Sequence, residues 1–171
     1  MARSTSGLAF ALPRSADLQQ VSVGHFRLGA IVSRSTRWRD TQAIAFADCV
    51  EHGLISGRRA SCPSITCWRR SSAVCANRAG RCWRAASLEL SRQLARRGLG
   101  VAFQTRLGIE ADIAQGELRF LPLKDNGGIH SDLGLYVRTG RYLPVAVDAL
   151  ARQIAEEVRL REREEARLNE A

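Results

Sequence analysis

The order of apolar and polar residues predicts strands in the first part of the chain. Residues 7–12, GLAFAL, form a continuous apolar run closed by Pro13, which is typical of a strand buried on both faces. Between residues 21 and 32, apolar side chains alternate with polar or small ones, as expected of a second, longer strand. Residues 41–55 mix a short strand-like start with a turn or a helix start.

Helix signals become clearer from residue 87 onward. Ser87 can cap a helix in which Leu90 and Leu94 lie on one face, and Gly98 would end that helix. Residues 100–103, GVAF, then predict a buried strand.

A second short helix and a further strand are predicted next. Thr105 can cap this helix and Gly116 would end it. Its inward-facing residues would be Ile109 and Ile113. Residues 118–123 then predict a strand.

The C-terminal part of the chain predicts a turn, a strand and a long helix. Residues 124–131 have turn composition, residues 133–137 are apolar, and Pro144 suits the first position of a helix. We expect that helix to bury Val147, Leu150, Ile154 and Val158. Residues 159–171 are expected to continue as a charged, solvated tail. Strands that alternate with helices indicate an α/β fold with a largely parallel sheet.

Length and composition are those of an ordinary globular protein. The chain has 171 residues, 45% of them hydrophobic and 25% charged, which fits one domain or two small lobes. No apolar run approaches the roughly 18 residues of a membrane span. The first residues also lack the apolar length of a signal peptide. We therefore expect a cytoplasmic protein without membrane contact.

The positive charge of the chain is concentrated in one segment. The formal net charge is +9, but residues 57–84 carry seven arginines and no acidic residue, so the rest of the chain carries only +2. This segment combines cations with aromatic rings, as surfaces that bind single-stranded nucleic acid do: Arg58, Arg59, Arg69 and Arg70 with Trp68 and Trp83. A small basic nucleic-acid-binding or interaction protein is therefore an alternative interpretation.

The second half of the chain resembles a known family. The resemblance lies in the order of a helix, RGLGVAF at residues 97–103, a second helix, GEL at 116–118, LGLYVR at 133–138 and RYLP at 141–144. This order resembles the effector-binding (substrate-binding) domain of LysR-type transcriptional regulators. Residues 7–10 and 18–32 are similar to earlier strands of that domain. The resemblance implies a periplasmic-binding-protein-like (type II) fold with two lobes and a mixed or parallel sheet.

The chain also departs from this family pattern. The helix-turn-helix, the linker helix and the opening β-α units of the first lobe have no counterpart, so we expect an incomplete, truncated domain over residues 1–158 and no specific DNA contact. Residues 57–84 match nothing in the family, and their composition resembles sequence read out of frame. A non-functional frameshifted fragment is thus a further alternative.

The resemblance also implies a ligand and the residues that bind it. Effectors of this family are held by strand ends, helix N-termini and hydroxyl groups, an arrangement that suits small anions. The corresponding positions are Ser33, Ser87, Phe103, Gln104 and Thr105. Ser87 and Thr105 could instead only cap helices, and Phe103 could only fill the core. A homodimer, or a pair with an intact LysR-type regulator, is the expected protein partner.

The remaining reactive side chains predict neither a metal site nor an enzyme. Cys62, Cys67, Cys75 and Cys82 contain no Cys-x-x-Cys pair. The three histidines lie far apart and near no nucleophile, so no general acid-base set emerges. We expect no cofactor and no catalytic activity.

Overall fold

The computed structural model describes residues 6–10, 12, 15–38, 40–57, 81–125, 128–140 and 142–170. The chain divides into two compact units. The first unit combines Met1–Phe26 with Ser131–Ala171, and the second is Arg27–His130. Most of the basic segment at 57–84 lies outside the described residues. The expectation that this segment is aberrant therefore concerns residues outside the description.

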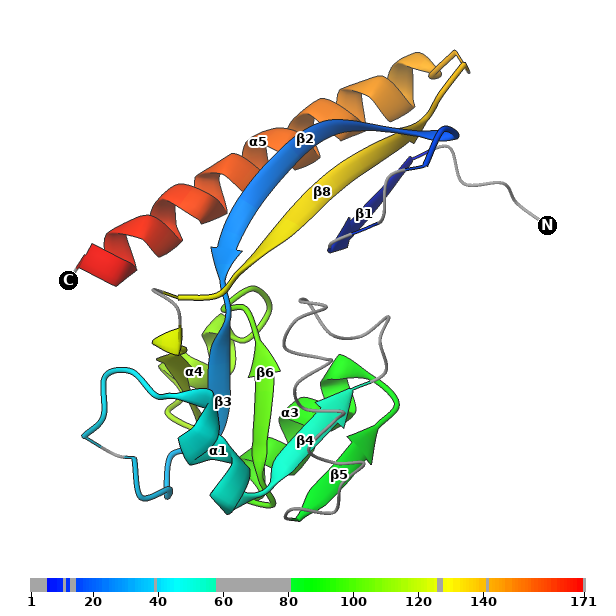
Figure 1. The fold of residues 1–171 in the computed structure, drawn as a ribbon. Helices are drawn as coiled ribbons and strands as arrows, with labels where there is room; N and C mark the ends of the chain where they lie inside the picture. The colour runs from blue at the N-terminus through cyan, green and yellow to red at the C-terminus, as the bar shows by residue number, and fades with distance from the viewer. Residues whose placement is uncertain are drawn as a thin grey trace. The chain divides into compact units, whose positions relative to one another are not determined.

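The first unit is a three-stranded sheet with one long helix (Figure 1). Strand β8 (His130–Arg138) lies between β1 (Ser6–Phe10) and β2 (Leu18–Arg27). Helix α5 (Val145–Glu170) packs closely on β2, because a Cβ atom at Gly24 would lie 2.6 Å from Val158. The helix continues without a break past residue 158, and Arg161 pairs with Glu157 at 2.8 Å.

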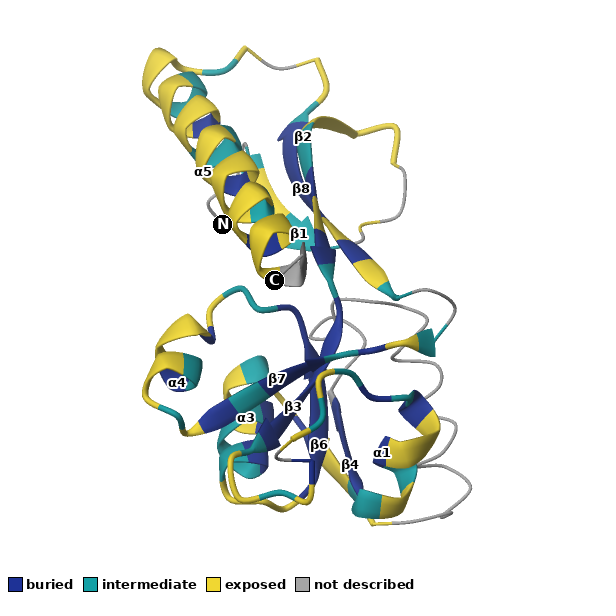
Figure 2. Ribbon diagram, turned by 90° about the vertical axis from the view of Figure 1, so that its left-hand side faces the viewer, coloured by how far each residue is buried: buried dark blue, intermediate teal, exposed yellow. Residues whose placement is uncertain are grey.

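The second unit is a five-stranded sheet with helices on both faces (Figure 2). Its strand order is β5-β4-β6-β3-β7. The strands are β3 (Gly29–Ser33), β4 (Leu54–Gly57), β5 (Cys82–Ala85), β6 (Val101–Gln104) and β7 (Leu118–Pro122). Strands β5, β4 and β6 are parallel, whereas β3 runs antiparallel to both β6 and β7. The sheet is therefore mixed, as the resemblance implied.

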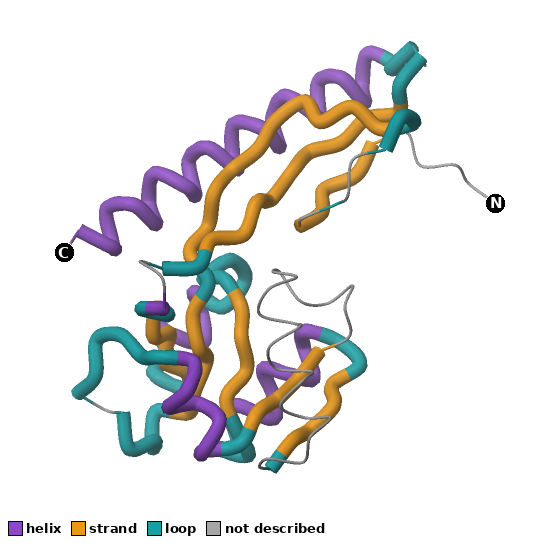
Figure 3. Tube along the Cα trace, in the orientation of Figure 1, coloured by secondary structure: helices purple, strands orange, loops and turns teal. Residues whose placement is uncertain are grey.

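In this second unit α1 (Phe46–His52) lies between β3 and β4 in the sequence, α3 (Leu88–Arg96) between β5 and β6, and α4 (Glu110–Ala114) between β6 and β7 (Figure 3). Two apolar clusters lie on opposite faces of the sheet, because successive side chains of a strand point to opposite sides. The cluster toward α1 includes Ala30, Phe46, Phe103 and Leu121, and the cluster toward α3 and α4 includes Ile31, Ala95, Ala102 and Phe120.

Two strand predictions need correction. The apolar run at residues 7–12 forms strand β1, but Leu8 is 48% exposed, because β1 lies at the edge of its sheet and pairs with β8 alone among the described strands. The long strand predicted at residues 21–32 is two strands, which separate at Leu28 and join different sheets. The basic segment, residues 57–84, ends inside regular structure, since β4 includes Gly57 and β5 begins at Cys82.

Three helix predictions also need correction. Thr105 caps no helix, because a turn with Gly108 at φ +79° follows it and α4 begins after Ile109. Leu90 and Leu150 are exposed, and Ala95 and Ala151 occupy the buried faces of α3 and α5 instead. Among the described residues, no helix combines the length and the apolar character that a membrane span needs.

Candidate functional site

The carboxyl ends of three parallel strands meet at one edge of the second unit's sheet. Gly57 at the end of β4 pairs with Ala85 at the end of β5, and Ile55 pairs with Ala102 of β6. This register aligns the segments that follow β5 and β6. Ligands of α/β proteins bind preferentially outside the carboxyl ends of parallel strands. We call this edge the carboxyl edge.

Ser87 stands at the carboxyl edge as the N-cap of α3. Its backbone is extended, at φ −142° and ψ 163°, and its Oγ accepts a hydrogen bond from the Leu90 N–H at 3.2 Å. The sequence prediction of this cap is confirmed. Ser87 is exposed, and the positive end of the helix dipole lies beside it. The N-terminus of α3 therefore offers backbone donors and a hydroxyl group to an anion.

Gln104 ends β6 at the same edge with one unsatisfied polar atom. The residue is 7% exposed, and its Nε2 donates to the Leu107 carbonyl oxygen at 3.2 Å. Its Oε1 is buried and has no hydrogen-bond partner in the part of the chain that the structure describes. Leaving a buried acceptor unpaired costs about 1–3 kcal/mol. Thr105, which follows it, is 1% exposed.

The other two predicted residues lie elsewhere in the second unit. Phe103 is buried on the α1 face, where its ring stacks on Phe46 at a centroid distance of 5.2 Å. Ser33 lies at the opposite end of the sheet, because Gly29, not Ser33, pairs with Gln104. Its Oγ is 3.1 Å from that of Ser35. The structure thus brings together Ser87, Gln104 and Thr105, and leaves Ser33 and Phe103 apart from them.

Sequence reasoning missed one residue at the carboxyl edge. Ser56 is 5% exposed and stands next to the last residue of β4, opposite Arg84 of β5. A hydroxyl residue followed by glycine at the end of an apolar run was the available signal. The irregular pattern of residues 41–55 hid this strand end.

Charges on α3 are balanced within the helix and with α4. Hydrogen bonds from Gln93 and Arg92 lower the pKa of Glu89, which therefore stays ionised in the first turn. Arg92 also lies 3.5 Å from Asp112 of α4, and Arg96 pairs with Asp112 and with Glu117. The Glu89 charge is thus paired, which reduces its repulsion of an anion at the N-terminus of α3.

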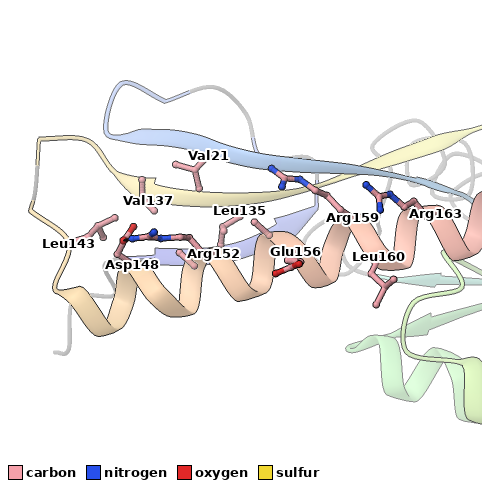
Figure 4. A pocket seen from close by; sticks show the side chains of 12 residues that line it. Val21, Leu135, Val137, Leu143, Asp148, Arg152, Glu156, Arg159, Leu160 and Arg163 are labelled. Carbon is pink, nitrogen blue, oxygen red and sulfur yellow. Dashed lines mark hydrogen bonds and ion pairs between the residues drawn. The ribbon is translucent and has the colours of Figure 1, made fainter.

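A larger pocket lies in the first unit, between α5 and the sheet (Figure 4). Its volume is about 620 Å³, and its lining includes Val21, Leu135, Val137 and Leu143. Arg152 donates to Asp148 at 3.1 Å on the helix side, and Figure 4 shows Arg159 and Arg163 on the side of α5 toward β2. In this unit β8 pairs antiparallel with β1.

The other reactive side chains form no recognisable centre. Within the described residues, no group of three His, Cys, Asp or Glu side chains could hold a metal ion. Cys62, Cys67 and Cys75 lie outside those residues. Cys49 is buried in the core, and burial, with Asp48 and Asp125, raises the pKa of its thiol to about 12.

Regulatory and effector-binding domains are among the solved structures that this chain resembles. The reduced OxyR regulatory domain from Pseudomonas aeruginosa shares 16% identity with a TM-score of 0.66, and the alignment covers 88% of this chain and 72% of that one. The CcmR regulatory domain from Synechocystis, in complex with 2-PG, shares 16% identity with a TM-score of 0.69, covering 90% and 73%. The QuiR effector-binding domain, in complex with shikimate, shares 12% identity with a TM-score of 0.65, covering 88% and 69%.

A family model also matches the sequence over most of its length. The LysR substrate binding domain matches residues 6–159. Among curated protein sequences, none matches significantly. The family consists of transcriptional regulators rather than enzymes, and the match favours an effector-binding domain over a basic nucleic-acid-binding protein. The fold predicted from the resemblance is confirmed. This chain belongs to the LysR substrate-binding domain family.

Proposed function

We propose that this chain binds a small anionic effector at the carboxyl edge of β5, β4 and β6, without catalysing a reaction on it. The observation that carries the proposal is the buried, unpaired Oε1 of Gln104. An acceptor in that state is satisfied when a ligand supplies a hydroxyl or N–H group.

Each residue at the edge has a role in this proposal. Ser87 and the N-terminus of α3 bind the carboxylate or phosphate of the effector, because free N–H groups and the helix dipole favour negative charge there. Gln104 accepts a hydrogen bond from a hydroxyl group on the same ligand. Thr105 shapes the wall beside it. The effector is therefore a small acid that also carries a hydrogen-bond donor.

The solved relatives support a small molecule as the ligand. The CcmR domain is in complex with 2-PG and the QuiR domain with shikimate. We place the activity of this chain in the cytoplasm, where regulators of transcription of this family act. The partner is a second copy or an intact LysR-type regulator, because β1 and β2 are edge strands of their sheet.

A thermal-shift panel with shikimate, benzoate, pyruvate and 3-phosphoglycerate tests the proposal. A ligand that binds only the folded state stabilises it by RT ln(1 + [L]/Kd), so Tm rises with the logarithm of the ligand concentration once that concentration exceeds Kd. The ligand with the largest shift is then titrated calorimetrically against wild type, Gln104→Met and Ser87→Ala. We expect each substitution to weaken binding about tenfold.

The matched control is Ser35→Ala, a hydroxyl loss near Ser33 and away from the carboxyl edge. It should leave the affinity unchanged. A panel with no binder, or a binder that is indifferent to both Gln104→Met and Ser87→Ala, would refute the site.

A further inference from the structure

A second pocket in the second unit gathers three arginines around an apolar floor. Its volume is about 300 Å³. Arg34, Arg106 and Arg119 line it together with Ile113, Leu118 and Phe120. Leu118, Arg119 and Phe120 belong to β7, and Ile113 belongs to α4, which packs against β7. Pockets of this size and mixed lining bind small organic ligands.

Arg106 is held over the floor of the pocket. Its guanidinium carbon lies 4.8 Å from the centre of the Phe120 ring, a cation–π contact that fixes the side chain. Its Nε is buried and has no hydrogen-bond partner within the described residues. A buried donor of a charged group that stays unpaired costs more than a neutral one. The Arg106 Nε–H is therefore a hydrogen-bond donor without an acceptor among the described residues.

The other two arginines are positioned by backbone groups. Gly116, at φ +69°, leaves room for Arg34, because a Cβ atom there would lie 2.7 Å from the Arg34 Nη1. Arg119 donates from Nη1 to the Trp38 carbonyl oxygen at 2.9 Å. It also donates from Nη2 to that of Thr41 at 3.4 Å. Carbonyl oxygens orient this guanidinium without neutralising it.

Among the described residues, no carboxylate lines the pocket to balance these charges. Asp112 and Glu117, which flank the lining residues Ile113 and Gly116 in the sequence, pair with other arginines: Asp112 with Arg92 and Arg96, and Glu117 with Arg96. Among the described residues, none of the three lining arginines forms an ion pair. Like charges that share one concave site raise the local concentration of anions and repel each other until one binds.

We propose that this pocket binds an organic anion, namely a carboxylate or a phosphate monoester on a small hydrocarbon body. Guanidinium groups bind the planar or trigonal oxygens of such anions in a fork, and Leu118, Ile113 and Phe120 cover the hydrocarbon part. The floor of the pocket lies away from the carboxyl edge, because Leu118 pairs with Ser33, whereas Gln104 pairs with Gly29 at the other end of β3. The pocket is thus a second ligand site, independent of the proposed effector site.

Amide NMR titrations with benzoate, phenyl phosphate and neutral benzyl alcohol test this second site. We expect both anions, and not the alcohol, to shift the amide signals of Gly116, Leu118 and Arg119. The amide signals of Ser87 and Gln104 should not follow the same binding curve. Inorganic phosphate should bind more weakly than phenyl phosphate, because it leaves the apolar floor uncovered.

Two variants and one matched control complete the test. Arg106→Gln and the exposed Arg34→Gln should each weaken binding of phenyl phosphate about tenfold. Arg97→Gln, which removes the same charge from the C-terminal end of α3, should leave it unchanged. Equal weakening of binding by Arg97→Gln would show nonspecific attraction and overturn the proposal. Amide chemical-shift changes that are confined to the carboxyl edge at saturating ligand would also overturn it. Thermal melts verify folding of each variant.

Discussion

The Arg92 guanidinium of α3 lies 3.5 Å from the Asp112 carboxylate of α4, and this contact ties the two helices on one face of the sheet together. Arg96 binds the same carboxylate, which is 8% exposed as a residue. One buried acid thus pairs with two arginines. The orientation of α3, whose N-terminus stands at the carboxyl edge, depends partly on Asp112.

Replacing Asp112 should destabilise the second unit. Asp112→Asn leaves Arg92 and Arg96 without their shared charge, and we expect a loss of about 1–2 kcal/mol because the arginines are partly exposed and screened. Urea unfolding measures the change. The control Asp148→Asn, in an exposed pair with Arg152, should change stability by less than about 0.5 kcal/mol. Equal effects from both substitutions would contradict this assignment.

Removing the cap of α3 should weaken the same helix. Ser87→Ala deletes the acceptor of the Leu90 N–H and should cost about 1 kcal/mol of unfolding free energy. Ser87→Asp keeps an acceptor and should retain most of the stability. Thermal unfolding compares the two variants. An Asp variant as unstable as the Ala variant would show that Ser87 does not act as a cap.

Protonation of His52 should destabilise the fold at mildly acidic pH. Burial, with Arg37 and Arg81, lowers the pKa of His52 below its ordinary value of 6.5. The unfolded chain therefore binds the proton more readily, so stability falls as pH drops below about 6.5 through the folded-state pKa. His52→Gln should flatten the dependence of urea midpoints on pH between about 7.5 and 5. An unchanged slope in this variant would remove His52 from the explanation.

Cys49 should be chemically inert in the folded protein. Its thiol is buried, and its pKa of about 12 leaves almost no thiolate at neutral pH. Iodoacetamide at pH 8, followed by peptide mass spectrometry, should leave the Cys49 peptide unlabelled in the native state. The same peptide should be labelled fully in urea. Rapid native labelling would mean that the α1 face of the core opens readily.

Local signals predicted the parts of the fold that short segments determine. The Ser87 cap, strand β6 and the helix end at Gly116 were predicted because a hydroxyl, an apolar run and a glycine act within a few residues. The sequence pattern does not show that residues 18–33 form two strands, because apolar and polar residues keep alternating through Leu28 while the chain passes from one sheet to the other. Pairing partners, not periodicity, decide that boundary.

The candidate site was predicted only in part, for a related reason. The family resemblance indicated Ser87 at a helix start and Gln104 at a strand end, and the parallel register brings the two segments to one edge. The distant position of Ser33 follows from the antiparallel direction of β3, which the sequence pattern does not contain. The unpaired Oε1 of Gln104 depends on side-chain packing and needs the structure.

A crystal structure with the strongest ligand of the thermal-shift panel shows whether Gln104 contacts an effector at the carboxyl edge. We predict a ligand donor within about 3.2 Å of the Gln104 Oε1. We also predict the ligand's acidic group at the N-terminus of α3, beside Ser87. A ligand seated only in the pocket along α5, or only in the three-arginine pocket, with the Gln104 Oε1 still unpaired, would contradict effector binding at the carboxyl edge.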